Sequence, residues 1–327
     1  MKRKVLQAVI SLLVVIFLAV LTMVLVRTRH ISIDAKPVLA TNFVAYDLAR
    51  ALMGEEKVEM LVPPGVDIHN FEPTPADIQK LAKTKLLIYN GGESEARVEK
   101  LLNDFKGETF KMMDNISELV IESELPAGSE PSDPSQAADE VRHSGGSHEG
   151  EVEYDEHVFV SPKNMMQILK NLTVKLVQVD PENQSNIQQK AESYLKELEA
   201  LDREIEETIQ NGKRQVLIFG DKFPLAYFVR DYHLKAFSAF AACSDEAEPD
   251  SQILSQLIDK IKSEHIPVVF KLEHTGDRIA KAITNETGAK ILPFYSFHFI
   301  SSADYKAGKT YLDLWRENIT VLREALN

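Results

Sequence analysis

Cysteine is almost absent from this sequence, since Cys243 is the only one in 327 residues. A single thiol excludes a disulfide within the chain and excludes zinc modules that need several thiolates. Two enzyme patterns are also missing: the chain has no Gly-x-Ser-x-Gly elbow and no His-Glu-x-x-His helix. Gly308-Lys309-Thr310 is not a phosphate-binding loop, because Ala303 stands where its first glycine belongs.

Basic residues are outnumbered, with Lys+Arg 37 against Asp+Glu 50 and a formal net charge of −13. A nucleic-acid binder needs a basic face that displaces phosphate counterions, so this balance argues against one. It favours a cationic ligand, although a solvated acidic surface is the more ordinary reading. The length of 327 residues is long for one core and predicts two globular lobes.

The amino terminus carries a targeting signal. Three basic residues at 2–4 precede an apolar run at 5–26, and Arg27 follows it. As a helix, this run can span a hydrocarbon core of about 30 Å. A cleaved signal peptide is the alternative, but its apolar part is normally shorter. We favour an uncleaved membrane anchor at 1–30, which places the remainder at the extracytoplasmic face of the plasma membrane because the basic flank stays inside.

Short apolar strands alternate with helical patterns from Lys36 onward. The first half predicts strands at 37–40, 58–62 and 86–89 and helices at 43–52, 75–82 and 95–104. The second half predicts strands at 215–219, 235–242, 267–272 and 290–294 and helices at 224–232, 251–263, 278–287 and 310–326. This alternation is typical of α/β lobes with parallel-rich sheets built from βαβ units.

A long helical pattern separates the two halves. Its apolar residues keep helical spacing from about 183 to 210. We therefore expect a rigid linking helix at 183–211 between an N-terminal lobe at 36–182 and a C-terminal lobe at 212–327.

Within the first lobe, the segment 121–156 is rich in serine, glycine, proline and acids and has little to bury. It predicts a mobile acidic surface loop. It is either a plain linker or, through His143 and His148, a loop that attracts a divalent cation.

A stiff loop follows the predicted strand at 58–62. Prolines lie at both of its ends, and His69 lies between them. Thr74 suits a helix N-cap, Pro75 suits the first helical position, and Asp77 stands where the acid of a capping box belongs. A pre-set loop that carries an imidazole suits a metal or catalytic site, although an ordinary turn can look the same.

Ligands of parallel α/β sheets bind at the carboxyl ends of the strands. In the first lobe this rule selects His69 and His157, which we expect at equivalent strand-to-helix turns. In the second lobe it selects Asp221, Glu273 and His274. Histidine and carboxylate donors from both lobes suit zinc, although a single loop histidine is more often a surface residue.

Two motifs resemble those of a known family. The segment 61–78, Leu-Val-Pro-Pro-Gly-Val-Asp-Ile-His followed by Asn-Phe-Glu-Pro-Thr-Pro-Ala-Asp-Ile, resembles the first metal motif of zinc/manganese ABC-transporter substrate-binding proteins of the ZnuA and adhesin-lipoprotein type. The segment 157–164, His-Val-Phe-Val-Ser-Pro-Lys-Asn, resembles their second motif, in which a histidine precedes a strand and a helix start. The likeness extends over essentially everything from Lys36 onward.

This resemblance implies a function. Two α/β lobes joined by a rigid helix would hold a divalent cation in their cleft, with Zn²⁺ expected and Mn²⁺ as the alternative. The loaded protein, expected to be a monomer and not an enzyme, would deliver the ion to an ABC permease in the membrane.

The resemblance also implies ligands. His69 and His157 would be those of the first lobe. The family's third ligand follows the first strand of the second lobe, where this chain has Gly220 and then Asp221. Its fourth, often an acid, falls near Tyr295. We expect Asp221 to substitute, with Glu273 as second choice; the further alternatives are His274, His298 and Cys243.

Two other functions compete with this one. The first is a zinc metalloenzyme with an open coordination position. The second is a cell-adhesion or accessory protein of the same fold with weakened metal binding, which the departures at Gly220 and Tyr295 favour.

Overall fold

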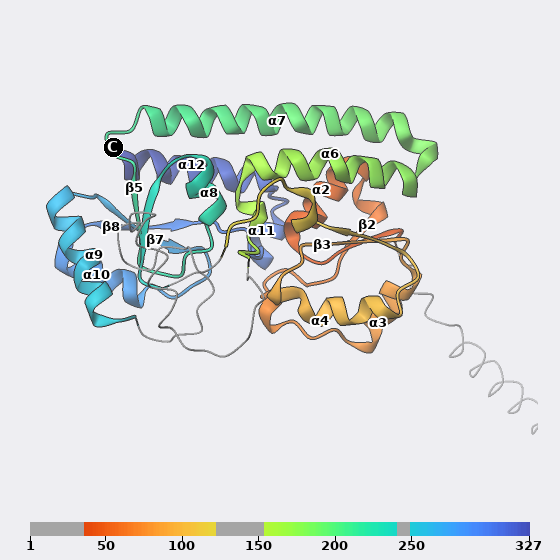
Figure 1. The fold of residues 1–327 in the computed structure, drawn as a ribbon, viewed down its shortest axis with the longest axis horizontal. Helices are drawn as coiled ribbons and strands as arrows, with labels where there is room; N and C mark the ends of the chain where they lie inside the picture. Colours follow the sequence, from red (N-terminus) through yellow and green to blue (C-terminus); the bar gives the residue numbers. More distant parts are fainter. Residues whose placement is uncertain (1–35, 122–153, 241–248) are drawn as a thin grey trace, which may run out of the picture. The chain divides into compact units, whose positions relative to one another are not determined.

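Two parallel sheets of four strands each organise the computed structural model, which describes residues 36–121, 154–240 and 249–327 (Figure 1). The first sheet has the order β2-β1-β3-β4, with β1 Val38–Ala40, β2 Val58–Met60, β3 Leu86–Tyr89 and β4 Glu108–Lys111. The second has the order β6-β5-β7-β8, with β5 Val216–Phe219, β6 Lys235–Ser238, β7 Val268–Leu272 and β8 Lys290–Phe294. The predicted α/β class is confirmed.

Helices connect these strands. The α-helices of the described residues are α2 Phe43–Met53, α3 Pro75–Lys83, α4 Ala96–Glu99, α6 Pro162–Val179, α7 Gln184–Gln210, α8 Ala226–Asp231, α9 Ser251–Glu264, α10 Arg278–Thr287, α11 Ser302–Lys306 and α12 Tyr311–Leu326. The helix predicted at 95–104 is instead the short α4 followed by a 3₁₀ turn. The sequence reading missed β4 and α11.

The helix after the His69 loop begins as its sequence predicts. The Thr74 Oγ1 accepts the Asp77 N–H at 3.3 Å, and the Asp77 carboxylate accepts the Thr74 N–H at 3.0 Å. This reciprocal capping box satisfies two amides that the first turn of α3 leaves without helical partners. The end of the histidine loop is thereby fixed.

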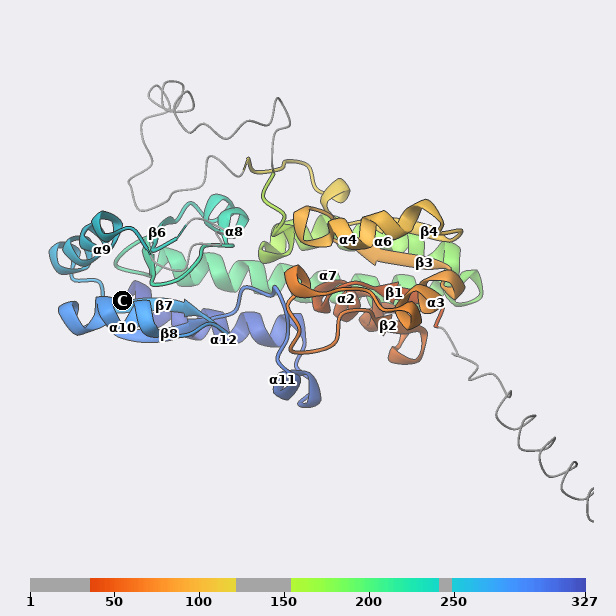
Figure 2. The same ribbon diagram turned by 90° about the horizontal axis from the view of Figure 1, so that it is seen from below.

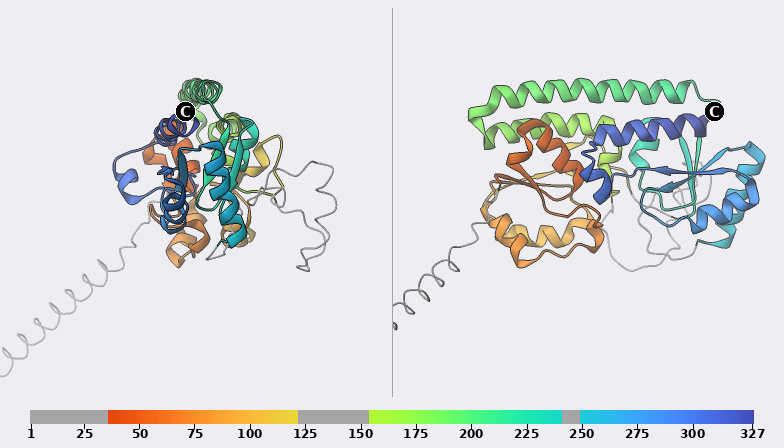
Figure 3. Two further views of the ribbon diagram at one scale, coloured as in Figure 1. Left: turned by 90° about the vertical axis from the view of Figure 1, so that its left-hand side faces the viewer. Right: turned by 180° about the vertical axis from the view of Figure 1, so that it is seen from behind.

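The long helix α7 joins the two sheets through one apolar core. It packs against α6, α2 and α12 and runs along both sheets (Figures 1 and 3). Its buried residues, such as Leu198, lie in one cluster with Ile88 of β3 and Phe270 of β7. The described residues between Lys36 and Asn327 accordingly belong to one compact unit.

Alternate strand residues face a second layer on the opposite side of each sheet. Leu39 and Leu87 pack with Leu81 of α3, whereas Ile218 and Val269 pack with residues of α9 and α10. Since side chains alternate along a strand, strands covered on both faces must be apolar throughout. Figure 2 shows the two sheets following one another along α7.

The apolar run after His157 is not a strand, contrary to the prediction. Val158–Val160 form a 3₁₀ turn, in which the Val160 N–H donates to the His157 carbonyl at 3.1 Å. Val158, Phe159 and Val160 are buried. A short buried apolar run has the same sequence pattern in a strand and in a turn, so periodicity could not distinguish them.

Several predictions lie outside the described residues. They concern the anchor at 1–30, His143 and His148 in the acidic loop, and Cys243. The ends of that loop are described, and Ile121 pairs there with Tyr154 in an antiparallel bridge. Within the described ranges, no helix has the length and apolar character needed to cross a membrane.

Candidate metal centre

Three histidines from distant parts of the chain converge. The ring centroid of His298 lies 4.7 Å from that of His69 and 5.1 Å from that of His157. Two sets of donor atoms share His298, one with Asp67 and His69 and the other with Glu156 and His157; within each set the atoms lie within 4.8 Å of one another. Imidazole nitrogens and carboxylate oxygens are a donor set that suits Zn²⁺ and also Mn²⁺.

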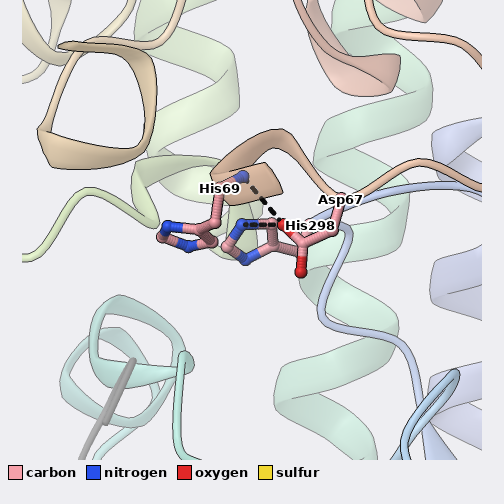
Figure 4. A group of neighbouring side chains, drawn as sticks. All are labelled: Asp67, His69 and His298. Carbon is pink, nitrogen blue, oxygen red and sulfur yellow. Dashed lines mark hydrogen bonds and ion pairs between the residues drawn. The ribbon is translucent and has the colours of Figure 1, made fainter. Parts of the chain in front are cut away.

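His69 lies on a 3₁₀ turn, Ile68–Asn70, whose start is fixed by Asp67. One carboxylate oxygen of Asp67 accepts the His69 N–H at 3.0 Å and lies 3.8 Å from the His298 Nε2 (Figure 4). Arg97 donates to the His69 carbonyl at 2.8 Å. Ile68 is buried in the core of the first lobe and anchors the turn from beneath.

His157 is buried and is oriented by Asp155. The Asp155 Oδ1 accepts the His157 backbone N–H at 2.6 Å and lies 3.0 Å from the ring Nδ1. A carboxylate on Nδ1 fixes the tautomer and leaves Nε2 as the donor for a metal, as second-layer carboxylates do in zinc sites. The neighbouring acid therefore orients the candidate ligand that the sequence indicated.

Glu156 directs a carboxylate oxygen at the same place. Its Oε2 accepts the Ser94 N–H at 3.0 Å. Its Oε1 is buried, has no hydrogen-bond partner among the described residues, and lies 3.7 Å from the His69 Nε2. A buried carboxylate oxygen without a partner is costly, and a bound cation would satisfy it.

The segment that carries His157 is fastened by the second lobe. The Tyr227 hydroxyl donates to the Asp155 carbonyl at 2.7 Å, and the Tyr311 hydroxyl donates to the Phe159 carbonyl at 2.9 Å. The Ser161 hydroxyl, which also caps α6, donates to Asp231. This first-lobe segment therefore takes its position from α8 and α12.

His298 lies on the loop between β8 and α11, which has an unusual backbone. Phe297, directly before it, has φ 64°. A bulky residue in this left-handed region is strained, and it persists only where its surroundings over-determine it. The Phe297 ring is buried, 4.8 Å from the Tyr311 ring and 5.2 Å from the Trp315 ring.

Two side chains clamp the backbone before Phe297. Asn318 accepts the Tyr295 N–H at 2.7 Å and donates to the Tyr295 carbonyl at 2.9 Å. Glu273 accepts the Ser296 N–H at 2.9 Å and the Ser296 hydroxyl at 3.1 Å. These contacts aim His298 towards the first-lobe histidines.

The loops of His69 and His298 also bond to each other. The Gly65 N–H donates to the Ile300 carbonyl at 2.8 Å, and the Ser302 hydroxyl donates to the Pro64 carbonyl at 2.9 Å. The two lobes thus meet through backbone groups beside the histidines.

The His298 imidazole is held neutral. Burial, followed by the nearby His157 and His69 and the ammonium of Lys222, places its pKa well below the usual range. A neutral imidazole is the form that binds a metal.

Asp221 and Glu273, the expected second-lobe ligands, belong to neither set of donor atoms. The Asp221 carboxylate accepts the Lys222 N–H at 2.8 Å and the Leu272 N–H at 3.0 Å, and it also accepts the Thr275 hydroxyl. It bridges the ends of β5 and β7, while Glu273 supports Ser296. The geometry brings together His69 and His157 and adds His298, which sequence reasoning ranked lower although it too follows a strand end.

A histidine at position 220, where the family resemblance expects a ligand, has no room. A Cβ added to Gly220 would lie 2.7 Å from the Ala280 Cα and 3.0 Å from the Ala280 nitrogen, which are backbone atoms of α10. We expect Gly220→His to lower the free energy of unfolding by about 1–3 kcal/mol, as overpacking does. Urea denaturation measures this.

The matched control is Gly276→His, because nothing lies within 4 Å of a Cβ added there. We expect its stability to stay near that of the wild type. Equal stability of the two variants would contradict the close packing of α10 on β5.

The fold and these donors define a class: a two-lobed α/β protein with a histidine- and carboxylate-lined centre between its lobes. The family model described as ZnuA, zinc-uptake complex component A, periplasmic, matches residues 38–325. The chain therefore belongs to this family.

Individual relatives align over most of this chain, at low sequence identity. The zinc-binding lipoprotein AdcA of Streptococcus pneumoniae serotype 4 is 24% identical over 288 residues, which are 88% of this chain and 55% of AdcA. The high-affinity zinc uptake system protein ZnuA of Bacillus subtilis is 25% identical over 90% of this chain and 88% of its own length. The chain thus spans about half the length of the streptococcal relative.

A solved structure shares the fold. The Zn(II)-bound ZnuA-like domain of S. pneumoniae AdcA aligns with a TM-score of 0.68 and 21% identity, over 88% of this chain and 98% of that domain.

Proposed function

We propose that this chain is the extracytoplasmic substrate-binding component of an ABC metal importer, which captures Zn²⁺, or alternatively Mn²⁺, and delivers it to a membrane permease. The observation that carries the proposal is the convergence of His69, His157 and His298 with Glu156. Family membership and the zinc-related names of the relatives support it.

In this proposal the ligands are His69, His157, His298 and Glu156, which give the four nitrogen and oxygen donors that zinc commonly takes. Asp67 lies beside them and balances positive charge. Asp221 and Glu273 hold the second-lobe loops instead of binding the ion. The task is retention and release, so no reaction is assigned to the site.

The sequence supports a tether as well. The basic residues at 2–4 and the apolar run at 5–26 would hold the protein at the outer face of the membrane, next to its permease.

Titration with Zn²⁺ against a competing fluorescent chelator at neutral pH tests the proposal. We expect one tightly bound ion per chain. Mg²⁺ prefers oxygen ligands in octahedral geometry, so it should not compete. Zinc binding no tighter than that of scattered surface carboxylates, or equal competition by Mg²⁺, would overturn the assignment.

A further inference from the structure

A cleft much larger than a metal ion opens beside the proposed centre. Its volume is about 730 Å³, and its walls include His69 and His298. Pockets that hold small organic molecules measure about 300–1,000 Å³, whereas one water fills about 30 Å³. The space therefore suits a small molecule next to the ion.

Three basic side chains line the cleft beside the proposed cation site. Arg97 and Lys100 line it from the first lobe, and Lys222 lines it from the second. This contrasts with the chain as a whole, whose net charge is −13. Among the described residues, no ion pair engages Lys100 or Lys222.

Three acids line the same walls and equal the three bases in number, so the bound divalent ion supplies the positive excess that would attract an anion. Asp67 faces His298 across 3.8 Å. Glu273 accepts both hydrogen bonds from Ser296, and burial raises its pKa to about 7. Glu93 is the third carboxyl group of the lining.

Lys222 and His298 line the same cleft. A divalent ion on His298 would be repelled by the Lys222 ammonium. An anion placed between the ion and the ammonium would turn this repulsion into two attractions.

We propose that the cleft binds a small oxyanion, a carboxylate- or phosphate-bearing molecule, together with the metal. The anion would add an oxygen to the bound ion as a fifth donor. It would also pair with Lys222, Lys100 and those guanidinium donors of Arg97 that the His69 carbonyl does not engage, because planar donors suit oxyanions. His274 and Phe299, stacked with centroids 4.4 Å apart, form part of the same wall. This inference rests on the proposed function, because it requires the ion to be present.

Equilibrium dialysis of the full chain tests it, with radiolabelled citrate, phosphate or histidine, each with and without zinc chloride. We expect one anion retained per bound zinc and none without zinc. Lys222→Gln and Lys100→Gln should each weaken anion retention about tenfold, as loss of a charged hydrogen bond does. In anion-free buffer Lys222→Gln should bind zinc more tightly. The control is Lys262→Gln, on α9 outside the cleft lining, which should change neither.

The outcomes separate the two proposals. Zinc bound at one ion per chain with none of the three anions retained would overturn the oxyanion site and leave the proposed function standing. Equal anion retention with and without zinc would overturn the coupling to the metal. Absence of zinc binding under every condition would overturn both. Retention of one anion but not the others would identify the chemistry that the cleft selects.

Discussion

The His298→Ala variant is expected to bind zinc more than about a hundredfold more weakly than the wild type. Loss of a residue that merely supports a metal ligand commonly lowers affinity about 10–100-fold, and loss of a ligand should exceed that. His298 is shared by both sets of donor atoms, so its removal leaves Glu156 and His157 on one side and Asp67 and His69 on the other. Competition titration with a fluorescent chelator measures the change.

The matched control is His274→Ala. His274 lines the same cleft and stacks on Phe299, yet it belongs to neither set of donor atoms. We expect its zinc affinity to stay within a few-fold of the wild type. An equal loss of zinc affinity in both variants would contradict the role of His298 as a ligand. A loss in Asp221→Asn that exceeds the loss in His298→Ala would indicate Asp221, the first choice from the sequence, as the second-lobe ligand.

Glu95 and Glu273 are each expected to stabilise the metal-free protein at pH 5 and to lose this effect as pH rises to 8. Burial raises the pKa of Glu95 and of Glu273 to about 7, from an ordinary value of 4.5. Within this window each of these two carboxyls is more protonated in the folded than in the unfolded state, so its contribution to the free energy of unfolding falls with rising pH. The lowered pKa values of His298 and His274 act in the opposite direction, so the contribution of each carboxyl is measured against a variant that lacks it. The contribution is fully present below pH 4.5 and is lost through pH 7, with an upper magnitude of about 3 kcal/mol for each carboxyl.

Urea denaturation at pH 5 and pH 8, with a chelator present, measures this dependence. Relative to the wild type, Glu95→Gln and Glu273→Gln should each lose less stability between pH 5 and pH 8, because an amide does not titrate. Carboxyls whose pKa is lowered, such as Asp313, lose their stabilising effect only as pH falls below about 4, outside the window. A pH dependence that is unchanged from the wild type in both variants would contradict the prediction.

Much of the fold could be predicted from local sequence signals. The capping box of Thr74 and Asp77 depends on residues three apart, and it forms as predicted. His69 and His157 lie at the centre, each beside an acid two residues earlier in the chain that accepts its backbone N–H. Such contacts are close in sequence and can be read from it.

The second-lobe side of the centre depends on contacts that are distant in sequence. His298 is aimed by the Asn318 clamp, by Glu273 and by a strained Phe297 packed on α12, and the sequence does not show that these residues meet at one loop. Gly220 is required because α10 packs against it, and Asp221 is occupied in joining β5 to β7. The carboxyl-end rule found acids at the right edge of the sheet but could not show that hydrogen bonds already engaged them.

The His157 segment of the first lobe is held by Tyr227, Asp231 and Tyr311 of the second lobe. The two halves of the chain therefore cannot each form their part of the centre independently. A first-lobe fragment would contain two of the three histidines, but one of them would lack the groups that fix its backbone. Fragments cut after α7 should therefore regain metal affinity only on reassociation. Such a pair of fragments would serve as a zinc sensor. Zinc binding would promote the reassociation of the two fragments, and a fragment-complementation signal would measure that reassociation.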